Sequence, residues 1–265
     1  MLKKLLITGA NGTLGRLCRE RMHPFAETLR ISDLGDLGDA APHEELVACD
    51  LGDKAGVEAL VEGCDGIIHL GGQSTEGTWD AVRHANIEGV ANLYEAARKS
   101  SAPPRIIFAS SNHAIGFYKQ DENLDAHATT RPDSLYGVSK VFGEAMASLY
   151  HDKFGIETAS IRIGSCFPEP IDHRMLATWL SFDDFIRLIE RIFIVPRLGC
   201  PIIYGASNNV GTWWDNTAVQ YIGWTPQDSS EGFRAKLDAA MERPDKNDPR
   251  ALYQGGTFCS DGIHE

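Results

Sequence analysis

The stretch Lys3-Lys4-Leu5-Leu6-Ile7-Thr8-Gly9-Ala10-Asn11-Gly12-Thr13-Leu14-Gly15 decides the fold of this 265-residue chain. The apolar run that ends at Thr8 predicts a buried strand, and three glycines with a spacing of three residues follow it. Such glycines let the backbone turn sharply into a helix and approach a pyrophosphate, whose charge lies on the free N–H groups of the helix N-terminus. A purely structural turn would use the same residues, so context must decide.

Two carboxylates downstream supply that context. Ile31-Ser32-Asp33 ends a second predicted strand about twenty residues after the glycine turn, which is the spacing of an acid that binds the ribose of a dinucleotide. Asp33 favours NAD over NADP, because its charge would repel the 2′-phosphate. Asp50 follows a third predicted strand, Leu46-Val47-Ala48-Cys49, where it could reach an adenine amine or form an Asx-turn or helix cap; both remain open.

Apolar runs and helical spacing alternate along the chain. Further strands are predicted at 65–70, 105–110, 157–163 and 202–205, and helices at 53–61, 78–99, 131–153, where Pro132 suits a helix start, and 181–193. This alternation predicts an α/β fold, a Rossmann-type doubly wound parallel sheet with a small C-terminal substrate lobe. We expect one domain over 1–265, in which 1–163 mainly bind the dinucleotide and 164–265 mainly form the substrate side.

Composition excludes several classes of protein. The net charge of −12 opposes binding to nucleic acid or to an anionic membrane through a general basic surface, and no apolar run approaches the roughly 20 residues of a membrane span. The six cysteines form no C-x-x-C pair and the nine histidines no H-E-x-x-H motif, so we expect neither a disulfide framework nor a metal site. The first strand begins almost at Met1 and leaves no room for a leader, which favours a cytoplasmic location.

Tyr136-Gly137-Val138-Ser139-Lys140 carries the sharpest chemical signal, because a tyrosine and a lysine lie one helical turn apart on one face. A phenol has a pKa near 10, and lowering that pKa to about 7 requires roughly 4 kcal/mol of stabilisation of the phenolate. The Lys140 ammonium could supply part and a positive nicotinamide ring could add to it, while Ser111 bonds the same substrate oxygen. The alternative is a buried tyrosine beside a surface lysine.

Other candidate residues lie in the second half of the chain. Arg174 could clamp an anionic substrate through its planar fork, although Asp172 or Glu169 could pair with it at the surface instead. His113 and His173 are candidates for hydrogen bonds to substrate. Trp213 and Trp214 could stack on a sugar, but a structural corner is the preferred interpretation.

Several motifs together resemble the extended branch of the short-chain dehydrogenase/reductase superfamily, the NAD-dependent epimerase/dehydratase family. The matching motifs are Gly9-Ala10-Asn11-Gly12-Thr13-Leu14-Gly15, Asp33, Cys49-Asp50-Leu51, His69-Leu70-Gly71-Gly72, Ser110-Ser111, Tyr136-Gly137-Val138-Ser139-Lys140 and Arg162-Ile163-Gly164-Ser165-Cys166-Phe167-Pro168. Within the branch, Ser111-Asn112-His113, Ser165-Cys166-Phe167-Pro168-Glu169-Pro170 and His173-Arg174 are most similar to the uronate dehydrogenases. The chain is short for an enzyme that encloses a nucleotide-sugar.

The resemblance implies roles for individual residues. The expected NAD-binding residues are Gly9, Asn11, Gly12, Thr13, Leu14 and Gly15 at the pyrophosphate turn, Asp33 at the adenosine ribose, Asp50 and Leu51 beside adenine, and Leu70, Gly71, Tyr136, Lys140 and Ile163 further along. The expected catalytic residues are Tyr136, Lys140 and Ser111, and the expected substrate-binding residues are Gln73, Ser74, Ser111, Asn112, His113, Tyr136, Ser165 and Arg174.

The resemblance also implies a reaction. We expect NAD-dependent oxidation of a hexuronic acid, galacturonate or glucuronate, at C1 to a lactone, with Tyr136 as the base and a homo-oligomer as the assembly. The alternatives are a nucleotide-sugar epimerase or dehydratase, which returns the hydride to its substrate, and a redox sensor that binds NAD without turnover.

Overall fold

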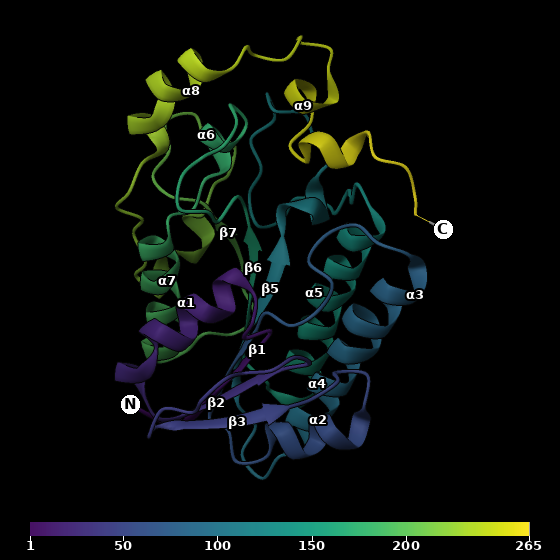
Figure 1. Ribbon diagram of the computed structural model, residues 1–265, viewed down its shortest axis with the longest axis vertical. Coiled ribbons are helices and arrows are strands. Elements are labelled where there is room, and N and C mark those ends of the chain that lie inside the picture. The colour runs from purple at the N-terminus through teal and green to yellow at the C-terminus, as the bar shows by residue number, and fades with distance from the viewer. Residues whose placement is uncertain (265) are drawn as a thin grey trace.

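A seven-stranded parallel sheet forms the centre of the protein, which is described over residues 1–264 by a computed structural model (Figure 1). The strand order is β3-β2-β1-β4-β5-β6-β7, which confirms the predicted doubly wound sheet. The strands are β1 Leu2–Thr8, β2 Ala26–Asp33, β3 Glu44–Ala48, β4 Gly66–His69, β5 Arg105–Ser111, β6 Thr158–Ile163 and β7 Ile202–Gly205. The order reverses between β1 and β4, so their carboxyl ends open a crevice where such folds bind ligands.

Helices cover both faces of the sheet (Figure 1). One face packs against α1 Thr13–Arg21 and α7 Phe182–Ile194, and the other against α2 Lys54–Val61, α4 Gly89–Lys99 and α5 Leu135–Phe154. The alternation of side chains along β1 divides the core between the faces: Leu5 and Ile7 belong to the first cluster and Leu6 to the second. Both α7 and β7 come from the last hundred residues, so these residues complete the sheet as well as the lobe above it.

The lobe gathers short elements beyond the carboxyl ends of the central strands (Figure 1). Its helices are α6 Met175–Thr178, α8 Arg234–Ala240 and α9 Pro249–Leu252, joined by 3₁₀ turns and irregular segments. No helix within residues 1–264 is long and apolar enough to cross a membrane.

Helix α5 begins later than the sequence predicted. Residues 131–134 are not helical, and Pro132 does not start the helix; Ser134 caps it by accepting a hydrogen bond from the N–H of Gly137 at 2.9 Å. The carboxylate of Glu76 adds a second cap, because its two oxygens accept from the N–H groups of Leu135 and Tyr136 at 3.1 and 2.9 Å. This second cap comes from a distant loop, so no local pattern announces it.

The predicted helix at 78–99 has a break in its regularity. It runs as α3 Trp79–Val82, a π-helical stretch Arg83–Glu88 and α4. The wider π turn carries Asn86, which is buried and bonds the backbone N–H and C=O of Gln73 as well as the hydroxyl of Ser139. The π turn therefore ties the loop after β4 to helix α5.

Candidate active site

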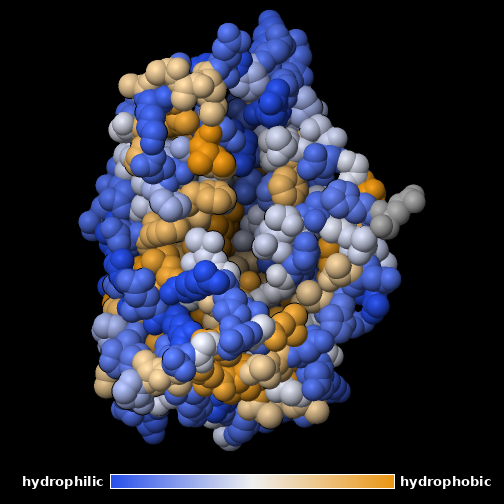
Figure 2. All heavy atoms as spheres, viewed as in Figure 1, coloured by the Kyte–Doolittle hydropathy of each residue, from blue (hydrophilic) through white to orange (hydrophobic). Residues whose placement is uncertain are grey.

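A cleft of about 940 Å³ opens at the carboxyl ends of β1, β4, β5 and β6, and Figure 2 shows the hollow near the middle of the viewed face. Nine of the fourteen predicted cofactor residues line it: Gly9, Gly12, Thr13, Leu14, Gly15, Leu70, Tyr136, Lys140 and Ile163. All eight predicted substrate residues line it too: Gln73, Ser74, Ser111, Asn112, His113, Tyr136, Ser165 and Arg174. The strand order therefore brings together residues that are scattered over most of the chain.

The glycine turn has the shape of a phosphate cradle. Gly9 has a φ of 70°, and a Cβ on Gly15 would lie 2.1 Å from the carbonyl oxygen of Gly9, so neither position accepts a side chain. No side chain caps the N-terminus of α1 at Gly12. Its N–H groups and the positive end of its dipole thus remain available to an anion, and this end of the cleft fits a pyrophosphate.

The other predicted cofactor residues lie at the same edge of the sheet but outside the cleft lining. They are Asn11, Asp33, Asp50, Leu51 and Gly71. Asp33 holds the turn, because its Oδ2 accepts from the N–H of Asn11 at 2.9 Å. Asp50 accepts a hydrogen bond from the N–H of Gly52 at 2.8 Å and bonds His84. It therefore forms the Asx-turn that was the alternative to a contact with adenine.

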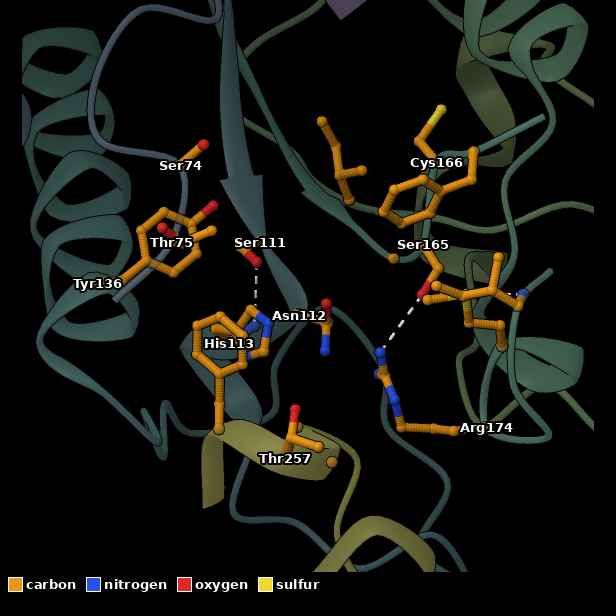
Figure 3. A pocket seen from close by; sticks show the side chains of 18 of the residues that line it. Ser74, Thr75, Ser111, Asn112, His113, Tyr136, Ser165, Cys166, Arg174 and Thr257 are labelled. Carbon is orange, nitrogen blue, oxygen red and sulfur yellow. Dashed lines mark hydrogen bonds between the residues drawn. The ribbon is translucent and has the colours of Figure 1, made fainter. Parts of the chain in front are cut away.

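Tyr136, Ser111 and Lys140 converge on the floor of the cleft (Figure 3 shows the first two). The Lys140 ammonium lies 5.2 Å from the centroid of the Tyr136 ring and 5.3 Å from that of Phe108. Both side chains are buried. This is the geometry expected of a tyrosine that is activated by a neighbouring lysine.

The pKa values show what the protein alone does to this pair. Burial raises the pKa of Tyr136 to about 12, against a hydrogen bond with Ser111 that lowers it, and the charge of Asp133 adds to the rise. Burial lowers the pKa of Lys140 to about 8. Burial therefore dominates the pKa of Tyr136, which stays above its usual value of about 10.

Arg174 reaches into the cleft opposite Tyr136 (Figure 3). Its Nη1 donates to the backbone oxygen of Gln254 at 2.9 Å and its Nη2 to the Ser165 hydroxyl at 3.4 Å, but no carboxylate within residues 1–264 forms an ion pair with it. Asp172 caps Met175, and Glu169 pairs with Lys236. Burial lowers the pKa of Arg174, against the charges of Asp172 and Asp133 that raise it, so this guanidinium is partly desolvated and no carboxylate bonds to it directly.

The last residues of the chain form a wall of the cleft that the sequence analysis missed. Gly255, Gly256, Thr257 and Phe258 line it, and the Phe258 ring stacks on His113 with centroids 3.8 Å apart. Met241 to Pro244 line its outer end. In the sequence, the pair Gly255-Gly256 is the signal for a close approach of the backbone.

Other candidate residues have structural partners. His173 lines the cleft, but its Nε2 bonds Asp238 at 2.9 Å. Trp214 is buried, stacks on Tyr204 and donates to the side-chain oxygen of Gln254, which supports the preferred interpretation of a structural corner. All six cysteines are free, and no group of three or more metal-binding side chains occurs within residues 1–264.

The chain is similar to known proteins in both sequence and fold. The sequence profile of the NAD dependent epimerase/dehydratase family matches residues 5–181. The chain is 55% identical over 260 residues to a uronate dehydrogenase of Pseudomonas putida, covering 98% of this chain and 96% of that one. A crystal structure of a glucuronic acid dehydrogenase from Chromohalobacter salexigens has 54% identity and a TM-score of 0.98, with 99% and 98% of the chains covered. A mutant uronate dehydrogenase from Agrobacterium tumefaciens complexed with NAD has 54% identity and a TM-score of 0.96, with 98% of each chain covered.

Proposed function

This chain belongs to the NAD-dependent epimerase/dehydratase family, and we propose that it is a dehydrogenase that oxidises a hexuronic acid at C1 with NAD. Relatives that share more than half of its residues over nearly the whole chain are uronate and glucuronic acid dehydrogenases. The substrate class is galacturonate or glucuronate, and the product is the corresponding lactone, because oxidation of a cyclic hemiacetal at C1 leaves the ring closed.

The observation that carries this proposal is the unpaired guanidinium of Arg174. A partly buried cation to which no carboxylate bonds is costly, and an anionic ligand relieves that cost. The planar fork can donate two parallel bonds to the C6 carboxylate of a uronate, a match that a neutral aldose lacks. Since the chain carries a net charge of −12, only a local cation can select an anion.

Bound NAD⁺ supplies the hydride acceptor and a positive nicotinamide ring. Tyr136 takes the proton of the C1 hydroxyl while the C1 hydride leaves, so that C1 and its oxygen form the lactone carbonyl. Ser111 donates a hydrogen bond to the same oxygen. Lys140 would hold the nicotinamide ribose, and its charge together with that of the ring would favour the ionised form of Tyr136.

The cofactor lies along the edge formed by β1, β2 and β4 in this proposal. Gly9, Gly12 and Gly15 cradle the pyrophosphate, and Asp33 accepts hydrogen bonds from the adenosine ribose. Asp50 and Leu51 flank adenine from just beyond the cleft lining. All fourteen proposed NAD-binding residues lie within 1–163, which we propose serves mainly NAD, and residues 164–265 add Ser165 and Arg174 to the substrate side.

Formation of NADH tests the proposal against its alternatives. Galacturonate and glucuronate should give stoichiometric NADH, whereas matched neutral aldoses and nucleotide-sugars should give little. An epimerase would convert a nucleotide-sugar without net NADH, and a redox sensor would bind NAD and release no product with any sugar. Absence of NADH with every uronate would contradict the assignment.

The assembly and location belong to the same proposal. Trp79, Val138, Leu149 and Phe154 are exposed apolar side chains on helices α3 and α5, which supports a homo-oligomer formed through these helices. Six free cysteines suit the reducing cytoplasm. Light scattering of the purified protein in solution measures the assembly directly.

A further inference from the structure

We propose that Asp133 is a positioning residue that fixes the tautomer of His113, so that His113 Nε2 accepts a hydrogen bond from a hydroxyl of the sugar. The inference rests on the proposed function for the identity of the sugar. The position of the proton on the His113 ring can be measured without turnover and is independent of that function.

The hydrogen bonds around Asp133 determine which nitrogen of His113 carries a proton. The carboxylate is buried with no exposed side-chain area; its Oδ2 lies 2.8 Å from Nδ1 of His113, and its Oδ1 accepts from the hydroxyl of Ser134 at 2.8 Å. An ionised carboxylate can only accept hydrogen bonds, so Nδ1 must donate. In the neutral ring Nε2 then carries a lone pair and no proton.

The surrounding backbone packs closely around this carboxylate, because glycines stand at two positions beside it. A Cβ on Gly116 would lie 1.8 Å from Oδ2 of Asp133, and a Cβ on Gly255 would lie 1.9 Å from the same atom. The two glycines also bond to each other, with the N–H of Gly255 donating to the oxygen of Gly116 at 2.9 Å. Two segments far apart in the chain are thus fitted around one acid.

The imidazole itself is held in one orientation. Phe258 stacks on one side of the His113 ring, and Tyr136 meets it edge-on with centroids 5.7 Å apart. His113 retains 12% of its side-chain exposure and lines the cleft, while its Nε2 makes no hydrogen bond within the described residues 1–264. The free acceptor therefore faces the cleft close to the tyrosine that addresses the reacting oxygen.

An acceptor at this place completes the recognition of the sugar. Arg174 bonds the carboxylate of the sugar, and Tyr136 and Ser111 bond its C1 oxygen. None of these three side chains contacts the other hydroxyls of the sugar in this proposal. A fixed acceptor selects a hydroxyl that points toward it and rejects a sugar that lacks one. Asp133 acts on specificity through His113 and touches no substrate itself.

The substitution Asp133→Asn tests the mechanism with a side chain of nearly equal shape. The Ser134 hydroxyl donates to Oδ1 of residue 133, so in the variant the amide oxygen takes this position. The amide NH₂ then points toward His113. Nδ1 must then accept, and the proton moves to Nε2. Nitrogen NMR of ¹⁵N-histidine-labelled protein near neutral pH should show His113 protonated at Nδ1 in the unsubstituted protein and at Nε2 in the variant.

The kinetic effect should follow one hydroxyl. We expect Asp133→Asn to raise KM for the uronate about 10-fold, the order of one lost hydrogen bond, with a smaller change in kcat and normal NADH binding. In the unsubstituted protein, one deoxy-uronate of a series, the one that lacks the hydroxyl bonded to His113, should show a similar rise in KM. For that analogue, Asp133→Asn should raise KM little further. Gly255→Ala, which displaces the carboxylate without removing it, should reproduce the rise in KM.

The matched control is Cys259→Ala, because the Cys259 thiol is another neighbour of the same carboxylate, with Sγ 3.9 Å from Oδ2. It should keep the Nδ1–H signal and the KM. A proton on Nε2 of His113 in the unsubstituted protein, an unchanged NMR pattern in Asp133→Asn, or an equal loss on every deoxy analogue would overturn the inference. If no uronate yields NADH, the proposed function fails while the NMR result still decides the tautomer.

Discussion

The substitution Arg174→Ala gives the most direct measure of substrate recognition. It removes a guanidinium that bonds only neutral oxygens, those of Gln254 and Ser165, and leaves no neighbouring carboxylate without a partner. Two charge-assisted bonds to the substrate carboxylate are lost, offset in part by water that enters the space. We expect a cost of about 2–4 kcal/mol in kcat/KM, since one hydrogen bond to a charged group contributes roughly 1.5–3 kcal/mol.

This cost corresponds to a fall of about 30- to 900-fold in kcat/KM for galacturonate or glucuronate. The assay follows NADH absorbance with each uronate and with the neutral aldose of the same ring configuration. Any slow activity on the aldose should change little, because a neutral sugar never used the clamp. Arg174→Lys is the matched control: it keeps a charge without the planar fork and should lose less than Arg174→Ala.

Two outcomes would refute the reasoning. An equal loss for charged and neutral sugars would indicate a defect of the loop and not the loss of a clamp. An unchanged kcat/KM for uronates would mean that another cation binds the substrate carboxylate. Arg243 and Arg250, which also line the cleft, would be the candidates, since Arg131 lies over the ring of Tyr118 at 4.9 Å and does not line it.

Four further predictions test other parts of the site and its support. Tyr136→Phe should lower kcat roughly 100-fold or more and leave NAD binding, followed by fluorescence, nearly intact, because only the proton acceptor is lost. Ser111→Ala should cost about 1–3 kcal/mol in kcat/KM and less than Tyr136→Phe; the reverse order would exchange their roles. Asp33→Ser should narrow the ratio of kcat/KM for NAD over NADP, and equal efficiency of the unsubstituted enzyme with both cofactors would contradict this placement. Glu144→Gln should lower the free energy of unfolding by about 3 kcal/mol or more in urea titrations, because it breaks a buried bidentate pair with Arg162.

The sequence alone determined the sheet and the chemistry that local geometry controls. A glycine turn between a strand and a helix depends on a few consecutive backbone angles, and two side chains four residues apart share a face of any helix. For this reason the spacing in β1 and α1, and the pair Tyr136 and Lys140, could be interpreted without a structure. The parallel order then placed the strand ends, and with them Ser111, at one edge.

Only the tertiary structure decided how that chemistry is held in place. Glu76 caps the helix of Tyr136 across 60 residues, and Gln254 holds Arg174 across 80. The wall at Gly255–Phe258 falls mostly in a single 3₁₀ turn, Gly256–Cys259, which is too short to show a hydrophobic period, and Asp133 lies in an irregular segment. Hydrophobic periodicity reports which face of an element is buried and not which distant residue meets it, so a bond between two irregular segments leaves no local trace in the sequence.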